Sequence, residues 1–371
     1  MSFALATLWH ERSRFLPGIL VVAFSALLIA VQGGLLLGIF SLFALPIDRS
    51  RADVWVGYPG TPSVDLCLPI PKAWEARLAV QPEVARVETY LYGTIAWGKR
   101  GGGIETCSVI GSSLDDESLG AITELTPELR ARLKESGSVV VDESALIDLG
   151  LTGLGDVAEV AGHRVRVVGV VHGIRGIAGA YIFCSLPTAQ TLLRMRPDQA
   201  VFLLAGCRNP ADVPTVLERL RTYENMSAFS RDEFSLRSRL HWLFKTKAGV
   251  ALGCAALLGL IVGAAVTSQT LSAATAASLR ELAVLEALGI PTWRMQALVL
   301  AQSFWVGLLG VALAVPASFC SAGVLQVLGA RIVLPAWMLG GAAGLTMAMA
   351  LLAGLVSLRA LRRVEPATLL R

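Results

Sequence analysis

The residues whose types and spacing could do chemistry lie in three short segments. Residues 112–118, SSLDDES, place three carboxylates side by side, and carboxylate oxygens are ligands for divalent cations. An acidic run is more often a solvated loop, and we favour that interpretation. Residues 98–103, GKRGGG, contain the letters of a phosphate-binding loop in the wrong order, which favours a hairpin loop. Residues 172–179, HGIRGIAG, lack the dinucleotide-binding spacing and indicate a flexible surface loop.

Patterns that mark common catalytic sites are absent from the sequence. There is no G-x-x-x-x-G-K-[ST], so the chain does not cradle ATP through a P-loop of its own, and neither H-E-x-x-H nor G-x-S-x-G occurs. The histidines do not stand at metal-ligand spacing; they are His10, His163, His172 and His241. The cysteines are expected to be buried free thiols, although spacing leaves a disulfide open; they are Cys67, Cys107, Cys184, Cys207, Cys254 and Cys320. We therefore predict a non-catalytic chain without a metal site or a cofactor of its own.

A short charged helix is predicted within residues 278–295, SLRELAVLEALGIPTWRM. Ser278 and Glu281 form a capping box, Gly289 follows the last helical residue, and Pro291 blocks continuation. At 100° per residue, the charged side chains are spread around the helix instead of leaving one broad apolar face. Such a helix suits contact with protein on several sides better than a position in the lipid interface. We therefore predict a docking helix, with a simple cap between two spans as the alternative.

The elements around this helix are strongly apolar. The 371-residue chain is 54% hydrophobic with a mean hydropathy of +0.62, which is too apolar for an ordinary soluble enzyme. Four runs contain no Asp, Glu, Lys or Arg, and each exceeds the roughly 20 residues that cross a bilayer as a helix. These runs are residues 15–47, 248–279, 295–330 and 332–358. We predict four transmembrane helices, because the first run is too long for the core of a cleaved signal peptide.

Small and polar residues inside these runs indicate how the helices pack. Gly34 and Gly38, like Gly259 and Gly263, stand at the G-x-x-x-G spacing that allows helices to approach closely. The amides of Gln32, Gln269 and Gln302 are candidates for polar contacts within the membrane, either across helices or along a substrate path. No run carries an ionisable residue, which argues against an ion-coupled pump.

A water-soluble domain separates the first run from the other three. Residues 85–98, and segments starting at Ile104 and Ser138, are predicted strands, and a hairpin is predicted to turn at residues 161–163. Helical spacing starts at Lys72, Thr126 and Asp212, and Gly137 is expected to end the second of these helices.

A second capping box marks the exit from this domain. Ser230 and Glu233 open a segment without Pro or Gly until Gly249. We predict one continuous stalk helix that rises from Ser230 and runs on as the second span.

Charge is concentrated in the soluble domain and nearly cancels there. Residues 48–247 hold 23 of the 32 basic and 24 of the 28 acidic residues, so the net charge of +4 is no basic patch for nucleic acid. With four spans, both termini and residues 278–295 lie on one side of the membrane. Counting Lys and Arg near the span ends hardly decides the orientation; it favours cytoplasmic termini because large domains translocate with little regard to charge.

The second and third runs, with the helix between them, resemble MacB/FtsX-like ABC transporter permeases. The resemblance is carried by Arg280 and Glu281, by the A-L-G turn at residues 287–289, and by the C-terminal P-x-x-x-L-R at residues 366–371. The N-terminal LWHERSRFLPGIL and RADVWVG are similar to the DevC-like branch of these permeases. Gln302 departs from the pattern, since many relatives carry Glu there.

The resemblance implies a permease subunit of an export system for a lipid-like or amphiphilic substrate. It implies a homodimer, a separate cytoplasmic ABC ATPase that binds ATP and Mg²⁺, a membrane-fusion adaptor, contact with membrane lipids, and a multi-pass place in the inner (cytoplasmic) membrane. Movement of the outer domain driven by the ATPase would be mechanotransmission. The alternatives are an FtsX-like signalling protein that activates an extracytoplasmic enzyme, and a lipoprotein-releasing permease. The residues implied to couple to the ATPase are Ser278, Arg280, Glu281, Leu285, Glu286, Leu288, Gly289 and Ile290.

The predicted fold is an α-helical membrane protein with four transmembrane helices (1+3) and an inserted mixed α/β extracytoplasmic domain between helices 1 and 2. Its parts are the cytoplasmic N-terminus and transmembrane helix 1 (1–47), the extracytoplasmic domain (48–229), the stalk and transmembrane helix 2 (230–277), the cytoplasmic coupling helix and turn (278–295), transmembrane helices 3 and 4 (296–358), and the cytoplasmic C-terminus (359–371).

Overall fold

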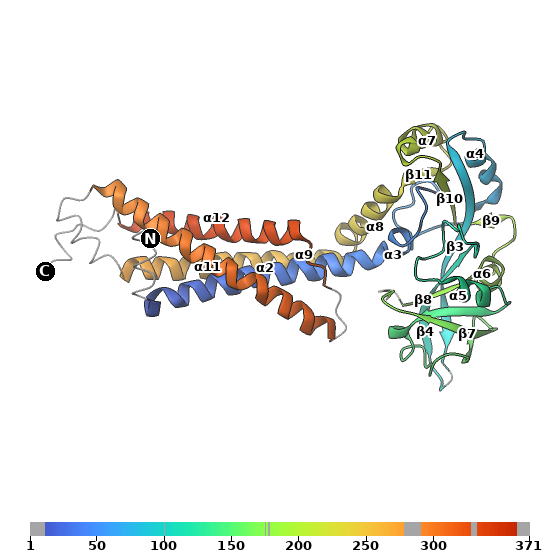
Figure 1. The fold of residues 1–371 in the computed structure, drawn as a ribbon, viewed down its shortest axis with the longest axis horizontal. Coiled ribbons are helices and arrows are strands. Elements are labelled where there is room, and N and C mark those ends of the chain that lie inside the picture. Colours follow the sequence, from blue (N-terminus) through green and yellow to red (C-terminus); the bar gives the residue numbers. More distant parts are fainter. Residues whose placement is uncertain are drawn as a thin grey trace. The chain divides into compact units, whose positions relative to one another are not determined.

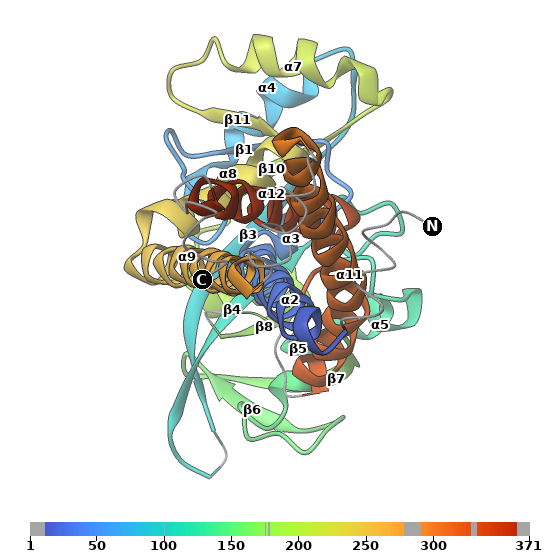
Figure 2. The same cartoon turned by 90° about the vertical axis from the view of Figure 1, so that its left-hand side faces the viewer.

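The computed structural model describes residues 12–99, 101–174, 176, 179–277, 291–327 and 332–361. The chain divides into two compact units. One is the inserted unit Phe40–Thr246, and the other, the helical unit, combines Met1–Ile39 with Lys247–Arg371. Figures 1 and 2 show the strands and short helices of the inserted unit and the long helices of the helical unit.

Long helices dominate the helical unit. They are α2 (Arg12–Phe43, whose last turn belongs to the inserted unit), α9 (Lys247–Ala277), α11 (Thr292–Val327) and α12 (Ala336–Leu361). Helices suit such apolar runs, because a bilayer offers the backbone no hydrogen-bond partners. Segments Phe15–Phe43, Val299–Val327 and Ala336–Leu355 are long and apolar enough to cross a membrane. Three of the four predicted spans are thereby confirmed by length and composition, while a span within α9 stays a prediction.

Helices α2 and α9 approach each other at small residues. A side chain added at Gly259 would come within 3.3 Å of Leu28, and one at Gly263 would come equally close to the Cβ atom of Ser25. The Ser25 hydroxyl donates a hydrogen bond to the Gly263 carbonyl over 3.3 Å. The predicted packing role of Gly259 and Gly263 is therefore confirmed, and the polar contact between these helices uses a serine.

The other long helices meet in the same way. A Cβ atom at Gly310 of α11 would lie 2.6 Å from a methyl group of Val22 in α2. Gly354 of α12 faces the side chain of Ser303 in α11. The carbonyl of Gly34 accepts a hydrogen bond of 3.2 Å from the backbone amide of Val333. Small residues thus determine where these helices meet. In lipid the hydrophobic effect does not drive helices together, so their association depends on close packing.

The inserted unit is built on one large mixed sheet. Among the described residues, nine strands follow the order β11-β1-β10-β3-β4-β8-β5-β7-β6, and β2 pairs with β9 in a small second sheet. The strands are β1 (Val54–Gly57), β2 (Ile70–Pro71), β3 (Val84–Gly98), β4 (Ile104–Ser112), β5 (Ser138–Asp142), β6 (Val157–Val160), β7 (His163–Val171), β8 (Ala180–Ser185), β9 (Gln199–Ala200), β10 (Phe202–Cys207) and β11 (Ser227–Ser230).

The long strand β3 runs through both parts of the sheet, an open part and a barrel. Its first half, Val84 to Tyr90, pairs with β10, while its second half, from Leu91, pairs with β4. Near its end, Trp97 and Gly98 also pair with β6, so the strands β3-β4-β8-β5-β7-β6 close into a barrel. Trp97 is fully buried, and its indole NH donates to the Leu149 carbonyl over 3.0 Å.

Short helices pack against both parts of the sheet. The short helices are α3 (Leu45–Asp48), α4 (Glu75–Ala79), α5 (Pro127–Leu133), α6 (Leu186–Leu193), α7 (Val213–Leu220) and α8 (Arg231–Lys245), with 3₁₀ turns η1 (Lys72–Trp74), η2 (Glu143–Ala145) and η3 (Pro210–Asp212). Of these, α4, α7 and α8 lie on the open part of the sheet, and α5 and α6 on strands of the barrel. Side chains alternate across each strand, so β1 sends Val54 and Val56 to a core shared with α4 and α7. Its Trp55 points into the other core and packs on Phe202 and on Phe234 of α8.

The predicted elements of this unit are largely confirmed. The hairpin turns at Ala161 and Gly162, which both have positive φ (49° and 84°), as a two-residue turn requires. Strands β3 and β4 pair up to Gly98 opposite Ile104, so the described residues of the GKRGGG segment, 98–99 and 101–103, lie at the end of a hairpin. The helix from Thr126 ends earlier than predicted, at Leu133, and a turn leads on to Gly137.

The single stalk helix predicted from Ser230 is wrong. Helix α8 does begin as predicted, with the Ser230 hydroxyl accepting from the Glu233 amide over 3.2 Å, but it ends at Lys245. Thr246 is extended (φ −101°, ψ 146°), its hydroxyl donates to the Trp242 carbonyl over 2.6 Å, and α9 begins at Lys247. The extended backbone at Thr246 therefore separates α8 from α9.

Candidate functional site

The predicted ATPase-coupling residues lie outside the described residues. These are Ser278, Arg280, Glu281, Leu285, Glu286, Leu288, Gly289 and Ile290. Their role stays a prediction based on the capping signals and the family resemblance.

The three candidate intramembrane amides stand on three different helices. Gln32 of α2 is half-buried, and its amide nitrogen lies 3.7 Å from the place that a Cβ atom would take at Gly259. Gln302 of α11 is also half-buried, whereas Gln269 of α9 is exposed. Gln32 thus lies at the contact of α2 with α9, and the role of the three amides stays a prediction.

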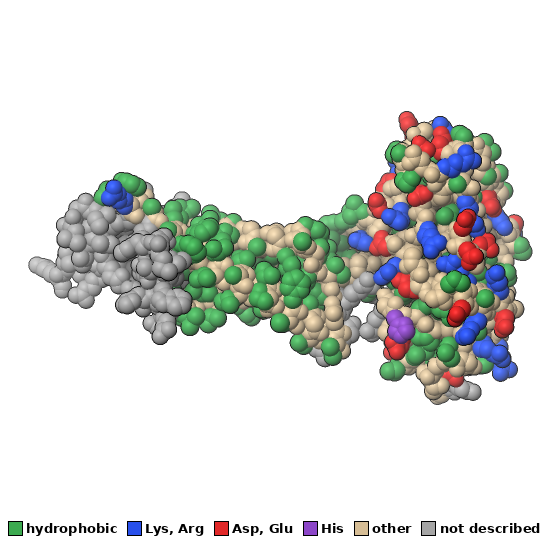
Figure 3. Space-filling view, viewed as in Figure 1, with side chains coloured by type: hydrophobic (Ala, Val, Ile, Leu, Met, Phe, Trp, Pro, Cys, Tyr) green, Lys and Arg blue, Asp and Glu red, His purple; other side chains and the backbone are tan. Residues whose placement is uncertain are grey.

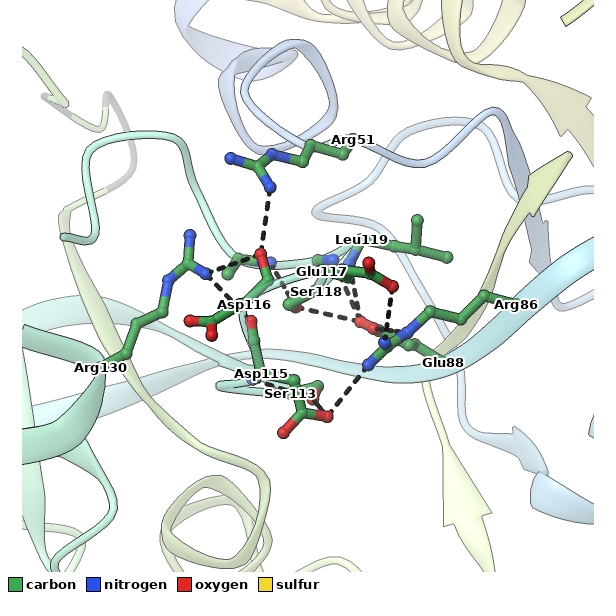
Figure 4. Close-up of polar contacts among 12 residues, drawn as sticks. Arg51, Arg86, Glu88, Ser113, Asp115, Asp116, Glu117, Ser118, Leu119 and Arg130 are labelled. Carbon is green, nitrogen blue, oxygen red and sulfur yellow. Dashed lines mark hydrogen bonds and ion pairs between the residues drawn. The ribbon is translucent and has the colours of Figure 1, made fainter. Parts of the chain in front are cut away.

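The acidic loop, residues 112–118, is held by arginines (Figure 4). Arg86 pairs with the Asp115 carboxylate at 3.0 Å, and Arg51 and Arg130 donate to the backbone carbonyl of Asp116. Hydrogen bonds from Ser113 and then from Arg86 lower the pKa of Asp115. Among the described residues, no group of three or more His, Cys, Asp or Glu side chains could hold a metal ion. The side chains of Asp115 and Glu117 are 65% and 89% exposed, so both carboxylates face the solvent.

A buried carboxylate beneath this loop was missed by sequence reasoning. Glu88 of β3 accepts hydrogen bonds from Arg86 at 2.6 Å, from the Ser118 hydroxyl at 3.0 Å, and from the amides of Leu119 and Gly120 at 2.9 and 3.3 Å (Figure 4). It is 6% exposed. The Glu88 carboxylate thereby holds the loop against the sheet, which is a structural role. Its pairing with Arg86 agrees with the rule that buried charges are paired. The only sequence signal is a glutamate in the middle of a strand.

A second polar cluster lies where the chain enters and leaves the inserted unit. We call it the base clamp, and it consists of Phe43, Asp48, Asp65, Ser235, Ser238, Arg239 and Trp242. The end of α2 and the helix α3 supply the first two residues, the loop after β1 supplies the third, and α8 supplies the rest. All of them belong to the inserted unit.

Asp48 makes the main polar contact of the base clamp. Its two carboxylate oxygens accept from the Ser235 hydroxyl at 2.6 Å and from the Arg239 guanidinium at 2.5 Å. Hydrogen bonds between charged groups are about twice as strong as neutral ones. The Nε atom of Arg239 is buried without a partner among the described residues, so this guanidinium depends on Asp48.

Trp242 makes the second contact of the base clamp. Its ring stacks on Phe43 with centroids 4.2 Å apart and planes within 9°. Its indole NH donates to Asp65 over 3.1 Å, and Asp65 also accepts from the Ser63 hydroxyl. The hydroxyl of Ser238 accepts from the Val64 amide at 3.3 Å. The incoming segment, the loop and the outgoing helix therefore form one packed body.

The barrel also contacts the incoming segment. The Tyr181 hydroxyl on β8 donates to the Leu42 carbonyl over 3.2 Å, and burial raises the pKa of Tyr181 well above its ordinary value. A phenol with such a pKa stays protonated and keeps donating this hydrogen bond. A movement of the end of α2 would therefore displace both the barrel and the open part of the sheet in the inserted unit.

The cysteines offer no nucleophile near this cluster. Burial raises the pKa of the Cys67 thiol, and likewise that of Cys107, to about 12, so both stay protonated at neutral pH. All six cysteines lie in the described part of the chain, and none is paired with another. Cys107 and Cys184 are buried, Cys67 and Cys207 are half-buried, and Cys254 and Cys320 are exposed, so the expectation of burial holds for only two of the six.

Comparisons with known proteins place the chain in a family. The sequence model of the MacB-like periplasmic core domain matches residues 19–223, more than half of the chain, and that of the FtsX-like permease C-terminal region matches residues 253–366. The chain belongs to the MacB/FtsX-like ABC permeases. The family and the apolar helices of this chain together indicate that it is a membrane protein. The resemblance stated from the sequence is thereby confirmed, whereas membership of the DevC-like branch stays a prediction.

Solved structures resemble this MacB/FtsX-like permease at low identity. The periplasmic region of MacB from Actinobacillus actinomycetemcomitans is 14% identical, with a TM-score of 0.34 over 50% of this chain and 92% of that one. The extracellular domain of the noncanonic ABC-type transporter YknZ from Gram-positive bacteria is 13% identical, with a TM-score of 0.33 over 47% and 98%. A domain of a putative permease from Porphyromonas gingivalis is 12% identical, with a TM-score of 0.30 over 50% and 90%. No significant match is found among curated proteins.

Proposed function

We propose that this MacB/FtsX-like chain is the permease subunit of an export system and that it works by mechanotransmission. A separate ATPase subunit binds and hydrolyses ATP with Mg²⁺, and the resulting displacement passes through the membrane helices to the inserted domain. The cargo is a lipid-like or amphiphilic molecule taken from the outer leaflet or the periplasm. The chain itself performs no chemistry.

The topology of this proposal includes a fourth span. Helix α9 is 31 residues long and uncharged after Lys247, which gives it the length and composition of a transmembrane helix. With four spans, both termini and residues 278–290 face the cytoplasm, and the chain lies in the inner membrane. Two copies pair as a homodimer, and a membrane-fusion adaptor receives the cargo.

The base clamp is the observation that carries the mechanical part of the proposal. The chain enters the inserted unit at Phe40 and leaves it at Thr246, and the clamp joins these two places through Asp48 and Trp242. A displacement of either helix end is therefore applied to a packed body, and packed protein interiors transmit strain because they are hardly compressible.

Purification of the full-length chain from its own host tests the partner. We expect an ABC ATPase to be recovered with it in mild detergent, and ATP hydrolysis by the complex to be measurable. Reversal of two charges, Arg280→Glu with Glu281→Arg, should remove most of the bound ATPase. A matched reversal on the exposed pair of α8, Arg231→Glu with Asp232→Arg, serves as the control.

Two results would contradict the proposal. Undiminished ATPase recovery after the change at Arg280 and Glu281 would exclude residues 278–290 as the coupling helix. Recovery of a cell-wall hydrolase in place of an adaptor would exclude export and leave the signalling alternative.

A further inference from the structure

One face of α8 carries large apolar side chains that the inserted unit leaves uncovered. Leu236, Leu240 and Phe244 are 56%, 41% and 66% exposed, whereas Phe234, Ser235 and Ser238 are buried against the sheet and the base clamp. The three exposed residues recur every four positions, so they lie within a sector of about 80° on the helix. We call them the outer stripe.

Basic residues flank the outer stripe on one side. Arg237 and Lys245 are exposed and stand about 100° and 180° around the helix from Leu236. The guanidinium of Arg237 lies 5.1 Å from the centre of the Phe229 ring, and neither basic group forms an ion pair with another described residue. The acidic residues of α8, Asp232 and Glu233, stand in its first turn, and from Leu236 onward an apolar stripe runs beside basic residues. That is the pattern of a helix that lies in a membrane interface.

The position of α8 along the chain agrees with such a place. Only Thr246 separates Lys245 from α9, the proposed fourth span, so the end of α8 cannot be far from the bilayer surface. A straight continuation of α9 would raise Leu236 about 13 Å above Lys245. Because the helix is interrupted at Thr246, Leu236 need not stand at that height.

We propose that the outer stripe is embedded in the outer surface of the bilayer, with Arg237 and Lys245 on the phosphates of anionic lipids. This inference rests on the proposed span in α9. A second copy of the chain is a poorer occupant, because symmetric pairing along the outer stripe would bring the basic residues of both copies together. Lipid phosphates carry the opposite charge, and acyl chains accept the leucine and phenylalanine side chains.

Photocrosslinking of the full-length chain in vesicles of phosphatidylcholine and phosphatidylglycerol tests this inference. The residue p-benzoylphenylalanine is placed in turn at Leu240, Phe244, Leu258 of α9 and Ile147, and lipid adducts are quantified by mass spectrometry. Ile147 is the control, since it is 88% exposed in the loop between β5 and β6. We expect adduct yields at Leu240 and Phe244 at least about fivefold above that at Ile147.

The outcomes separate this inference from the proposed function. Yields at Leu240 and Phe244 no higher than at Ile147, or crosslinked dimers in place of lipid adducts, would overturn the inference. Adducts at Leu258 in the same experiment would leave the fourth span standing, whereas their absence there would contradict that span.

The basic flank has a test of its own. Arg237→Glu with Lys245→Glu should lower the adduct yield at Leu240 several-fold in vesicles with phosphatidylglycerol and hardly at all in pure phosphatidylcholine. The same charge change at two exposed arginines elsewhere, Arg196→Glu with Arg208→Glu, should leave the yield unchanged. An equal loss in both kinds of vesicle would show that the basic residues do not recognise anionic lipid.

Discussion

The two units of this MacB/FtsX-like permease are stabilised in different ways. The inserted unit joins sequence-distant segments through charged and aromatic side chains, as Asp48 with Arg239 and Phe43 with Trp242 show. The helical unit relies on close approach at glycine, with Gly263 against Ser25 and no ionisable side chain at the contact. Figure 3 shows the same contrast on the surface, with charged side chains on the inserted unit and hydrophobic ones along the helices.

This difference follows from the solvent of each unit. In water, burying apolar surface stabilises the inserted unit, and buried polar groups must find partners. In lipid, association of helices gains nothing from leaving an apolar solvent, so shape and small residues decide. In the inserted unit, the substitutions that lower stability most should be those that remove the partner of a buried charge. In the helical unit, they should be those that add side-chain volume at a helix contact.

The largest effect is expected at the buried carboxylate Glu88. Glu88→Ala leaves Arg86, the Ser118 hydroxyl and two backbone amides without their acceptor, which should cost about 3–5 kcal/mol of unfolding free energy. Chemical unfolding followed by circular dichroism measures it. Glu117→Ala, at an 89% exposed side chain, should change stability by less than about 0.5 kcal/mol. Equal effects of the two changes would contradict the role given to Glu88.

The helical unit should respond to added volume at Gly310. A β-carbon there would lie 2.6 Å from a methyl group of Val22, so Gly310→Val should destabilise the contact of α2 and α11 by about 1–3 kcal/mol. Thermal unfolding of the protein in lipid nanodiscs would show it as a lowered Tm. Gly323→Val, a position with open space around it, is the matched control. A smaller loss at Gly310 than at Gly323 would refute the packing described here.

The base clamp should show an intermediate loss of stability. Asp48→Ala removes the partner of a partly buried guanidinium, and we expect about 1–2 kcal/mol, because both side chains are about one-third exposed. The outgoing helix α8 should then exchange its amide hydrogens faster, as hydrogen-exchange mass spectrometry can measure. Asp232→Ala, at a 94% exposed side chain on the same helix, should leave exchange in the rest of α8 unchanged.

The smallest effect concerns a thiol at the edge of the inserted unit. Burial, and then the charge of Asp53, raise the pKa of Cys207 to about 11. A raised pKa means less thiolate at a given pH, so alkylation of Cys207 in the folded protein should keep accelerating up to about pH 11. Peptide mass spectrometry separates it from the other cysteines. A rate that levels off near pH 9, as in the unfolded chain, would contradict the burial described here.

Local signals in the sequence predicted much of the fold. The uncharged runs, the capping box at Ser230 and the Gly-rich hairpin loop each depend on neighbouring residues, and each appears in the structure. The interruption at Thr246 was missed, because a single threonine is a weak signal against a long helical pattern.

The base clamp was out of reach of sequence reasoning. Asp48 and Arg239 are separated by 191 residues, and nothing local to either residue indicates the other. Glu88 is similar, because its partners come from a loop about 30 residues further along the chain. The acidic residues that first suggested chemistry turned out to be exposed neighbours of that buried carboxylate.

The most direct test of the account follows the distance between α8 and the rest of the inserted unit during ATP binding. Spin labels at Leu236→Cys and Val80→Cys, in the full chain with Cys254→Ser and Cys320→Ser and bound to its ATPase, report this distance by electron double resonance. We predict one narrow distribution that is the same without nucleotide and with ATP, and a broader one after Asp48→Ala. A distance that changes with ATP while the base clamp is intact would contradict the claim that the clamp moves the domain as one body.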